Sequence, residues 1–403
     1  MSSGERPVRL VLADDLKRSR GTVFFRLVFA LPFLIWLVVW SVAAALVAFV
    51  NWVATLFEGR SPAPLHDFLA RFVRYSTQVY AYLNLAAEPL PAFDGRPGYP
   101  VDVAIDPPAR QNRWTVAFRI VLVLPALLLV GVLLGGGNFV SELFRQGSFS
   151  LVGLAALLGW FYAMARGRMA HGLRDLIAYA LSYAAQVWAY LLLLTDRYPS
   201  SDPLAASESL PIRSDAVRTE VTDELRRSRL TVFFRLALAF PHLVWLSLWG
   251  VLALLVAIVN WFATLIEGSS PEWAHNFLAR YVRYQLQVSA FLYLVGNPFP
   301  GFVGAPGKYP IELHVDAPAR QNRWTVVFRL LLALPALLLS SVFAQVLLLV
   351  AVLGWFASLA TGRMPLGLRN LGAFALRYTA QTYAYVLLVT GAYPYSGPCL
   401  ERG

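Results

Sequence analysis

The chain has 403 residues, of which 58% are hydrophobic and only 14% are charged. Soluble domains carry about 25% charged residues, so this composition points to a bilayer as the solvent. The net charge is +11, but the basic residues cluster at the ends of apolar runs, where they fit topology signals and anionic lipid headgroups better than nucleic acid.

The opening segment, MSSGERPVRLVLADDLKRSRG, is too polar for a secretory signal, so we expect the first membrane segment to stay in the protein. The single cysteine, Cys399, lies in the C-terminal tail. It cannot form an intrachain disulfide, and one chain cannot build a cysteine metal cluster from it.

The chain contains an internal duplication. QNRWTVAFRIVLVLPALLL at 111–129 recurs as QNRWTVVFRLLLALPALLL at 321–339, and TVFFRL at 22–27 and at 231–236 aligns with the centre of both. An offset of about 210 residues, with a weaker offset of about 93 inside each half, predicts four repeats. The predicted boundaries are 8–98, 99–205, 215–305 and 308–398.

Each repeat is predicted to open with a short strand, because apolar residues alternate there. The four segments are VRLVL at 8–12, VDVAI at 101–105, VRTEV at 217–221 and IELHV at 311–315.

A long apolar run follows each strand. In the second repeat the run is interrupted by about 15 extra residues, GGGNFVSELFRQGSFS. Insertions are tolerated in loops and not inside a membrane-spanning helix, so we expect every run to turn at this point, near Ser41, Gly250 and Ser341. Each run is therefore predicted to be a hairpin of two helices, about 20 and 17 residues long, and a hairpin that dips into the bilayer without crossing is the alternative.

A third helix is predicted to close each repeat, near 65–87, 172–194, 274–295 and 368–389. Polar residues follow one face of it, which is typical of a helix in the membrane interface or packed obliquely on the hairpin. A Tyr-x-x-Gln-x-x-Ala motif predicts close helix packing, with a Gln- and Tyr-lined pathway as the minority interpretation. The stripe and packing residues are Asp67, Tyr75, Gln78, Asp175, Tyr183, Gln186, Asn276, Tyr284, Gln287, Asn370, Tyr378 and Gln381.

These elements predict an all-α integral membrane protein. It would contain four repeats of strand, helical hairpin and amphipathic helix, with pseudo-twofold symmetry and a small cytoplasmic β element of four strands. Because all four repeats carry arginines at the same ends, the positive-inside rule predicts eight crossing helices. Both termini, the strands and the third helices would then lie on the cytoplasmic side.

Two arginines recur at the start of every apolar run, and the second lies about two turns inside it. An unpaired charge there costs at least ~2.5 kcal/mol, so the guanidinium must snorkel, pair or bind a phosphate. One interpretation is helix anchoring with an internal brace to Asp67, Asp175, Asn276 or Asn370. The other is a set of anionic-lipid headgroup sites formed by Arg20, Arg26, Arg113, Arg119, Arg229, Arg235, Arg323 and Arg329.

Motifs for catalysis are missing from the sequence. It has no histidine pair at metal-binding helical spacing, no G-x-S-x-G, no P-loop and no dinucleotide-binding glycine pattern. His242 is interpreted as a polar residue that faces a neighbouring helix. We therefore predict no catalytic residue, no metal and no cofactor.

The order of motifs is a strand, R-x-x-x-x-F-R-x-x-x-x-x-P, W-x-x-x-x-x-x-G-R-x-P and the third helix, with DRYP (196–199) or AYPY (392–395) at the close. This order resembles the bacterial membrane family called domain of unknown function 4389, over nearly the whole chain as repeated copies. The second repeat departs at Ala170, and the first and third end in EPLPAF and NPFPGF. The resemblance implies an integral protein of the bacterial plasma membrane and carries no established activity.

The expected function is a non-catalytic membrane scaffold or accessory subunit that binds anionic lipid on its cytoplasmic face. Its expected partners are membrane lipids and a larger membrane complex or further copies of itself, without nucleic acid, since no basic-aromatic RNA motif is present. The alternative is a transporter or lipid-handling protein with a site between the two halves, and a membrane enzyme ranks third.

Overall fold

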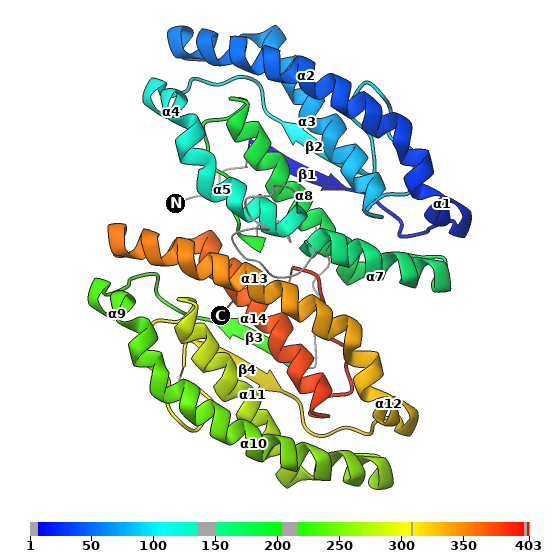
Figure 1. The fold of residues 1–403 in the computed structure, drawn as a ribbon, viewed down its shortest axis with the longest axis vertical. Coiled ribbons are helices and arrows are strands. Elements are labelled where there is room, and N and C mark those ends of the chain that lie inside the picture. Colours follow the sequence, from blue (N-terminus) through cyan, green and yellow to red (C-terminus); the bar gives the residue numbers. More distant parts are fainter. Residues whose placement is uncertain (1–6, 136–149, 204–216, 308, 399–400, 403) are drawn as a thin grey trace. The chain divides into compact units, whose positions relative to one another are not determined.

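The computed structural model describes residues 7–135, 150–203, 217–307, 309–398 and 401–402 (Figure 1). The chain divides into two compact units. Unit 1 contains the first two repeats and ends at Ser200, and unit 2 contains the last two. Cys399 and nearly all of the insert in the second repeat, with its charges Glu142 and Arg145, lie outside the described residues.

Three of the four apolar runs are single helices of 33 residues, so the predicted hairpins are wrong. They are α2 (Arg26–Glu58), α10 (Arg235–Glu267) and α13 (Arg329–Thr361). The expected turn positions lie inside these helices, where the hydroxyls of Ser41 and Ser341 donate to the carbonyls of Val38 and Leu338, both at 2.7 Å. The prediction of eight crossing helices depended on these turns and is withdrawn with them.

The second repeat explains why the prediction failed. Its run consists of α5 (Arg119–Leu134) and α7 (Leu151–Arg166), which follow one another in the same direction (Figure 1). A Cβ placed on Gly135 would lie 3.0 Å from Cβ of Ser150, so the two helix ends adjoin. Extra residues can therefore leave a long helix and rejoin it beside the point of departure, and an insertion is no proof of a hairpin turn.

A five-residue helix precedes each run: α1 (Arg20–Phe24), α4 (Arg113–Ala117), α9 (Arg229–Phe233) and α12 (Arg323–Val327). One phenylalanine, with φ between −96° and −89°, separates it from the long helix. The first recurrent arginine therefore begins the short helix, and the second begins the long one.

The third helices are α3 (Ala63–Leu83), α8 (His171–Leu191), α11 (Glu272–Leu292) and α14 (Leu366–Val386), close to their predicted positions. Each long run ends at a glycine with φ between 67° and 82°, a backbone conformation that side chains rarely adopt, and the chain then returns along the run. Each third helix packs against its long run on one side and a strand on another. It is thus a buried middle layer packed against the apolar run, which agrees with the second of the two interpretations and contradicts a place in the membrane interface.

All four predicted strands are confirmed: β1 (Val8–Leu12), β2 (Val101–Ile105), β3 (Val217–Val221) and β4 (Ile311–Val315). They form two separate antiparallel pairs, β1–β2 in unit 1 and β3–β4 in unit 2, with β5 (Glu401–Arg402) added to β3. The single four-stranded element that we expected is therefore wrong, because each pair is completed within one unit.

In each unit, the strand of one repeat packs on the third helix of the other repeat. β1 packs on α8 and β2 on α3, and β3 and β4 pack on α14 and α11 in the same way. A single repeat leaves its third helix uncovered, so the pair of repeats is the smallest element with a closed core. The antiparallel strands also show that successive repeats are inverted, which contradicts the expectation that all four point the same way.

Candidate functional site

The second arginine of each repeat is buried where the long helix begins. Arg119 is 1% exposed, and its guanidinium carbon lies 4.0 Å from the ring centroid of Tyr190. It donates to Oε1 of Gln111 at 2.6 Å, to Oδ1 of Asp196 at 3.1 Å and to the carbonyl of Thr195 at 3.3 Å. Cation–π contact and charge-assisted hydrogen bonds together replace water around this charge.

Arg26 has the same arrangement. Its guanidinium carbon lies 4.4 Å from the ring centroid of Tyr82. It donates to Oε2 of Glu88 at 2.8 Å, to the carbonyl of Ala87 at 3.0 Å and to the carbonyl of Tyr82. Both carboxylates, Glu88 and Asp196, follow the third helix, so the end of that helix supplies the polar surroundings of the arginine.

In unit 2 this carboxylate is missing from both equivalent positions. Asn297 occupies the place of Glu88, and Gly391 that of Asp196. Arg235 donates to the carbonyls of Gly296 at 3.2 Å and Asn297 at 3.3 Å, beneath the ring of Phe291. Arg329 donates to Oε1 of Gln321 and lies 4.1 Å from the ring centroid of Tyr385. Two of the four buried arginines are thus held by neutral groups in the hydrogen bonds described.

The third helices end in a way that the sequence patterns did not signal. Leu85, Leu193, Leu294 and Leu388 all have φ between 62° and 65°. The left-handed conformation costs a non-glycine residue about 1–2 kcal/mol. In return their carbonyls accept hydrogen bonds from Arg18, Gln111, Arg227 and Gln321 respectively. Only the recurrence of leucine at the same place in four repeats could have indicated them.

The expected brace partners at the start of the third helices lie elsewhere. The Asp67 side chain is 71% exposed, and Asn276 is also exposed. Asp175 accepts from Arg174 at 2.6 Å, and Asn370 donates to Asp202 at 2.9 Å. The internal brace therefore exists with Glu88, Asp196 and the backbone as partners.

The first arginine of each repeat is exposed and joins the two repeats of its unit. Arg20 donates to the carbonyl of Ala165 at 3.1 Å, and Arg113 to that of Phe57 at 2.8 Å. Arg229 and Arg323 contact Ala360 and Ile266 in the same way, at 3.0 Å and 2.8 Å. Each thus caps the C-terminus of the inverted neighbour, where a cation is favoured by the helix dipole.

The Tyr-x-x-Gln-x-x-Ala motif lies in the core of each unit. The tyrosines Tyr75, Tyr183, Tyr284 and Tyr378 are buried, and Tyr75 donates to the carbonyl of Phe33 at 3.1 Å. Tyr284 lies 2.8 Å from Nδ1 of His242, which places His242 against the third helix as predicted. The glutamines Gln78, Gln287 and Gln381 are buried, and Gln186 is half-buried and accepts from the backbone N–H of Ser200 at 3.1 Å. Gln78 and Gln381 donate to backbone carbonyls of Arg96 and Val217, at 2.9 Å and 2.8 Å.

Two buried histidines near the starts of α3 and α11 predict a pH dependence. Burial is the main cause that lowers the pKa of His66 and His275 below the ordinary value of 6.5. Below that pH the unfolded chain binds more protons than the folded one, so stability is lost as the pH falls through about 6.5. We expect the melting temperature in neutral detergent to fall from about pH 7.5 to 5.5. The variant H66N/H275N should show a smaller fall, and an equal fall would assign the dependence to other groups.

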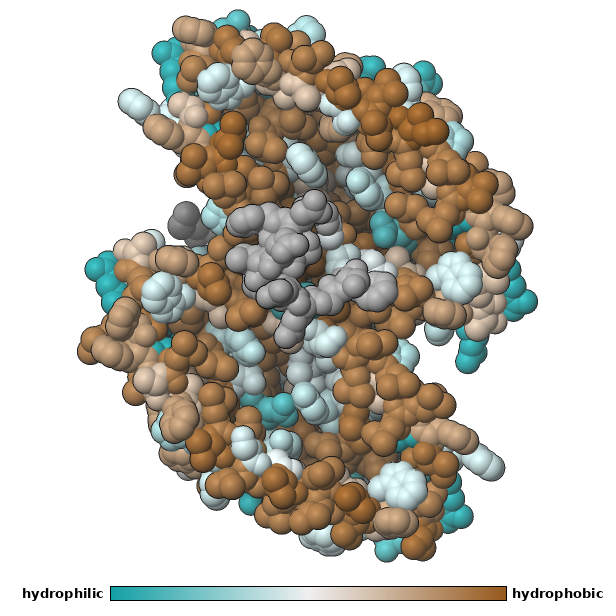
Figure 2. Space-filling view, in the orientation of Figure 1, coloured by the Kyte–Doolittle hydropathy of each residue, from teal (hydrophilic) through white to brown (hydrophobic). Residues whose placement is uncertain are grey.

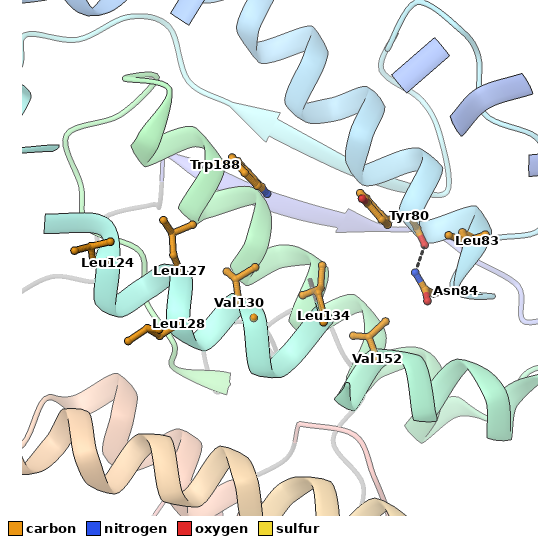
Figure 3. A pocket seen from close by; sticks show the side chains of 12 residues that line it. Tyr80, Leu83, Asn84, Leu124, Leu127, Leu128, Val130, Leu134, Val152 and Trp188 are labelled. Atoms are coloured by element: carbon orange, nitrogen blue, oxygen red, sulfur yellow. Dashed lines mark hydrogen bonds between the residues drawn. The ribbon is translucent and has the colours of Figure 1, made fainter. Parts of the chain in front are cut away.

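A groove of about 790 Å³ lies within unit 1, between the end of α3, α5 and α8. Figure 3 shows leucines of α5 along one side, with Trp188, Tyr80 and Asn84 contributing the polar atoms. The amide of Asn84 donates to the carbonyl of Tyr80 at 2.8 Å, and most of the other lining residues are aliphatic. Its lining suits an apolar chain better than a polar solute.

Comparison with known proteins identifies the repeats. The profile of the family described as Domain of unknown function (DUF4389) matches residues 20–94, 146–201, 229–303 and 323–396, one match in each predicted repeat. No curated protein and no solved structure matches the chain significantly. Since the four matches cover more than half of the sequence, the chain belongs to this family of unknown function and contains four tandem copies of its domain.

Proposed function

We propose that this protein is a non-catalytic scaffold or accessory subunit of the bacterial plasma membrane. In this proposal its long helices lie in the plane of the cytoplasmic leaflet, and its strands and both termini face the cytosol. The observation that carries the proposal is a two-sided unit. An uncharged face of long helices is backed, at the middle of their length, by strands that carry a few exposed charged side chains, among them Arg9 and Arg218.

Over two of the runs, the long helices expose uncharged side chains and bury their histidine, asparagine and threonine residues. From Leu27 to Phe57, 31 residues of α2 contain no charge, and Asn51 and Thr55 are buried. In α10 the polar residues His242, Asn260 and Thr264 are buried as well, and the hydroxyl of Ser247 bonds to its own helix. Figure 2 shows these helices as a hydrophobic surface, with hydrophilic residues gathered at the helix ends. Contiguous apolar surface of this size marks a membrane or protein contact.

Length and the position of the charges favour a flat orientation. The uncharged stretch of α2 is about 46 Å long, whereas the hydrocarbon core is about 30 Å thick. Ala44, near the middle of α2, shares a core cluster with Val73 of α3 and Val8 of β1. Beside Val8, the side chains of Arg9 and Asp106 form an ion pair at 3.5 Å and are 42% and 45% exposed. A spanning orientation would put this exposed pair at the bilayer centre, where charges are most costly.

The inverted repeats support the same orientation. Each pair of long runs carries arginines at both of its ends, which gives a crossing helix no preferred side under the positive-inside rule. In the plane of one leaflet, all these ends lie at headgroup depth. Among the described residues, three helices are long and apolar enough to span a membrane, so a spanning orientation is the competing outcome of the test.

Labels at three points along α2 test the orientation. In a Cys399→Ser background, Val28, Val39 and Phe57 are each replaced by cysteine and carry a fluorophore that lipid-attached quenchers reach at known depths. These exposed positions are 11 and 18 residues apart, close to whole helical turns, and so share one side of the helix. We expect three equal, shallow depths and a water-accessible label at Arg9. A deep label at Val39 between two shallow ends would contradict the flat orientation.

The groove in unit 1 favours lipid handling as the second candidate. Its apolar lining and its position beside the exposed face of α5 suit one acyl chain. A Leu127→Trp variant should then exclude a spin-labelled fatty acid from the protein. Unchanged binding of the probe would reject the groove as a lipid site.

A further inference from the structure

We propose that three corners of the two units, each formed by two inverted repeats, bind the phosphate of an anionic lipid headgroup. The Lys17 corner consists of Lys17, Arg20 and Arg168, the Arg60 corner of Arg60, Arg110 and Arg113, and the Arg226 corner of Arg226, Arg229 and Arg363. The inference rests on the proposed function, because the corners lie at the ends of the long helices that would contact the leaflet.

The proposal rests on pairs of basic residues that face each other across backbone bridges. Isolated antiparallel bridges join Lys17 to Arg168, Arg60 to Arg110 and Arg226 to Arg363. The Cβ atoms of residues directly opposite in such a pair lie about 4.5–5.5 Å apart, and like charges there destabilise the fold. All six residues are exposed, so their charged groups can reach a ligand outside the protein.

Capping of the helix C-terminus accounts for only one cation at each corner. Arg20, Arg113 and Arg229 already donate to the last carbonyls of the neighbouring long helix. The opposed pair adds two further cations beside them, and the described part of the chain shows no carboxylate ion-paired with each of the two. Asp15 lies 4.0 Å from Lys17, and Glu58 and Glu224 precede Arg60 and Arg226 by two residues. A phosphate between the opposed side chains would turn their repulsion into two charge-assisted contacts.

The fourth corner serves as an internal control. Its backbone is the same, since the N–H of Gln321 donates to the carbonyl of Gly268 at 2.8 Å as that of Gln111 does to Gly59. Ser269 stands where the first repeat has Arg60, so Arg320 and Arg323 lack the third cation. The inference therefore assigns anionic headgroups to three corners and not to the fourth.

Native mass spectrometry of the full chain tests the assignment in mixed micelles of neutral detergent with equal phosphatidylglycerol and phosphatidylcholine. The variant R60Q/R110Q should retain one phosphatidylglycerol fewer than wild type, and S269R one more. Each basic side chain at a membrane surface contributes about 1 kcal/mol, so affinity should change about fivefold per cation. R60Q/R110Q removes the repulsion between two opposed arginines, so its melting temperature without lipid should be unchanged or higher.

Unchanged phosphatidylglycerol retention in both variants would overturn the proposal. Inorganic phosphate at matched ionic strength distinguishes the source of the anion: displacement of the lipid would assign the corners to free phosphate and overturn the lipid assignment. Retention in micelles does not require a flat orientation. Failure of the depth measurement on α2 therefore rejects the proposed function separately from this inference.

Discussion

Replacement of Arg119 by alanine is expected to lower the free energy of unfolding by about 3 kcal/mol. This is the low end of the range for breaking a buried ion pair, because Asp196 is 32% exposed and water can partly solvate it once it is alone. The substitution also leaves the carbonyl of Thr195 and the amide of Gln111 without their shared donor. Urea unfolding in neutral detergent, followed by circular dichroism, measures the loss.

Two further substitutions calibrate this loss. Arg113→Ala removes the exposed arginine of the same motif and should cost less than about 1 kcal/mol, because its charge is already solvated. Arg329→Met removes a buried arginine that has no carboxylate among its described hydrogen-bond partners. Because no carboxylate loses its partner, the free energy of unfolding should fall less than in Arg119→Ala. A loss for Arg119→Ala no larger than that for Arg113→Ala would show that the buried arginines are not braces.

The second large effect concerns a position that differs between odd and even repeats. In the third repeat, Oδ1 of Asn260 accepts from Ser270 at 2.6 Å, and its Nδ2 donates to the carbonyl of Leu387 at 3.2 Å. In the fourth repeat Gly354 and Met364 occupy the same two places, and a Cβ on Gly354 would lie 2.7 Å from the sulfur of Met364. The Asn260–Ser270 pair of the third repeat and the Gly354–Met364 pair of the fourth thus occupy the same volume of their repeats.

Gly354→Asn alone is expected to cost about 1–3 kcal/mol, because the new side chain overlaps Met364 in a packed core. The double variant G354N/M364S should recover most of that loss, since it recreates the pair found in the third repeat. In the reverse direction, Asn260→Gly should cost about 1–3 kcal/mol by leaving Ser270 and the Leu387 carbonyl without a partner. A double-mutant cycle measured by thermal unfolding gives the coupling. If the changes in unfolding free energy caused by G354N and M364S are additive, the two positions do not pack as a matched pair.

Part of the fold could be predicted from local patterns. The alternation in VRLVL and VDVAI fixes which side of a strand is apolar, and both segments form strands with the predicted bounds. The glycine of the W-x-x-x-x-x-x-G-R-x-P motif lies at the end of each long run, because glycine adopts the left-handed conformation found at Gly59 without strain. The arginines at the start of each run also indicated a charge that needed a partner, although not which partner.

Long-range pairing could not be read from the same patterns. The insertion after Gly135 shows only that extra residues are tolerated there. A hairpin turn and a helix that continues beyond the insertion are both compatible with it. The identical arginine motifs suggested repeats of one orientation, whereas β1 and β2 pair antiparallel and invert them. Asp67 was the partner expected for Arg26 within its repeat, but its side chain is exposed, and the chain after α3 brings Glu88 to the guanidinium instead.

The sequence by itself determined four repeats, their strands and third helices, an uncharged stretch of 31 residues in the first long run and the need to neutralise an arginine at its start. These properties depend on neighbours within a few turns of the chain. Only the tertiary structure decided that repeats fold in inverted pairs, that Glu88 and Asp196 meet the buried arginines and that Lys17 opposes Arg168. Those contacts join residues from 62 to about 150 positions apart, and they follow from how the third helices bury their surface, which no local pattern records.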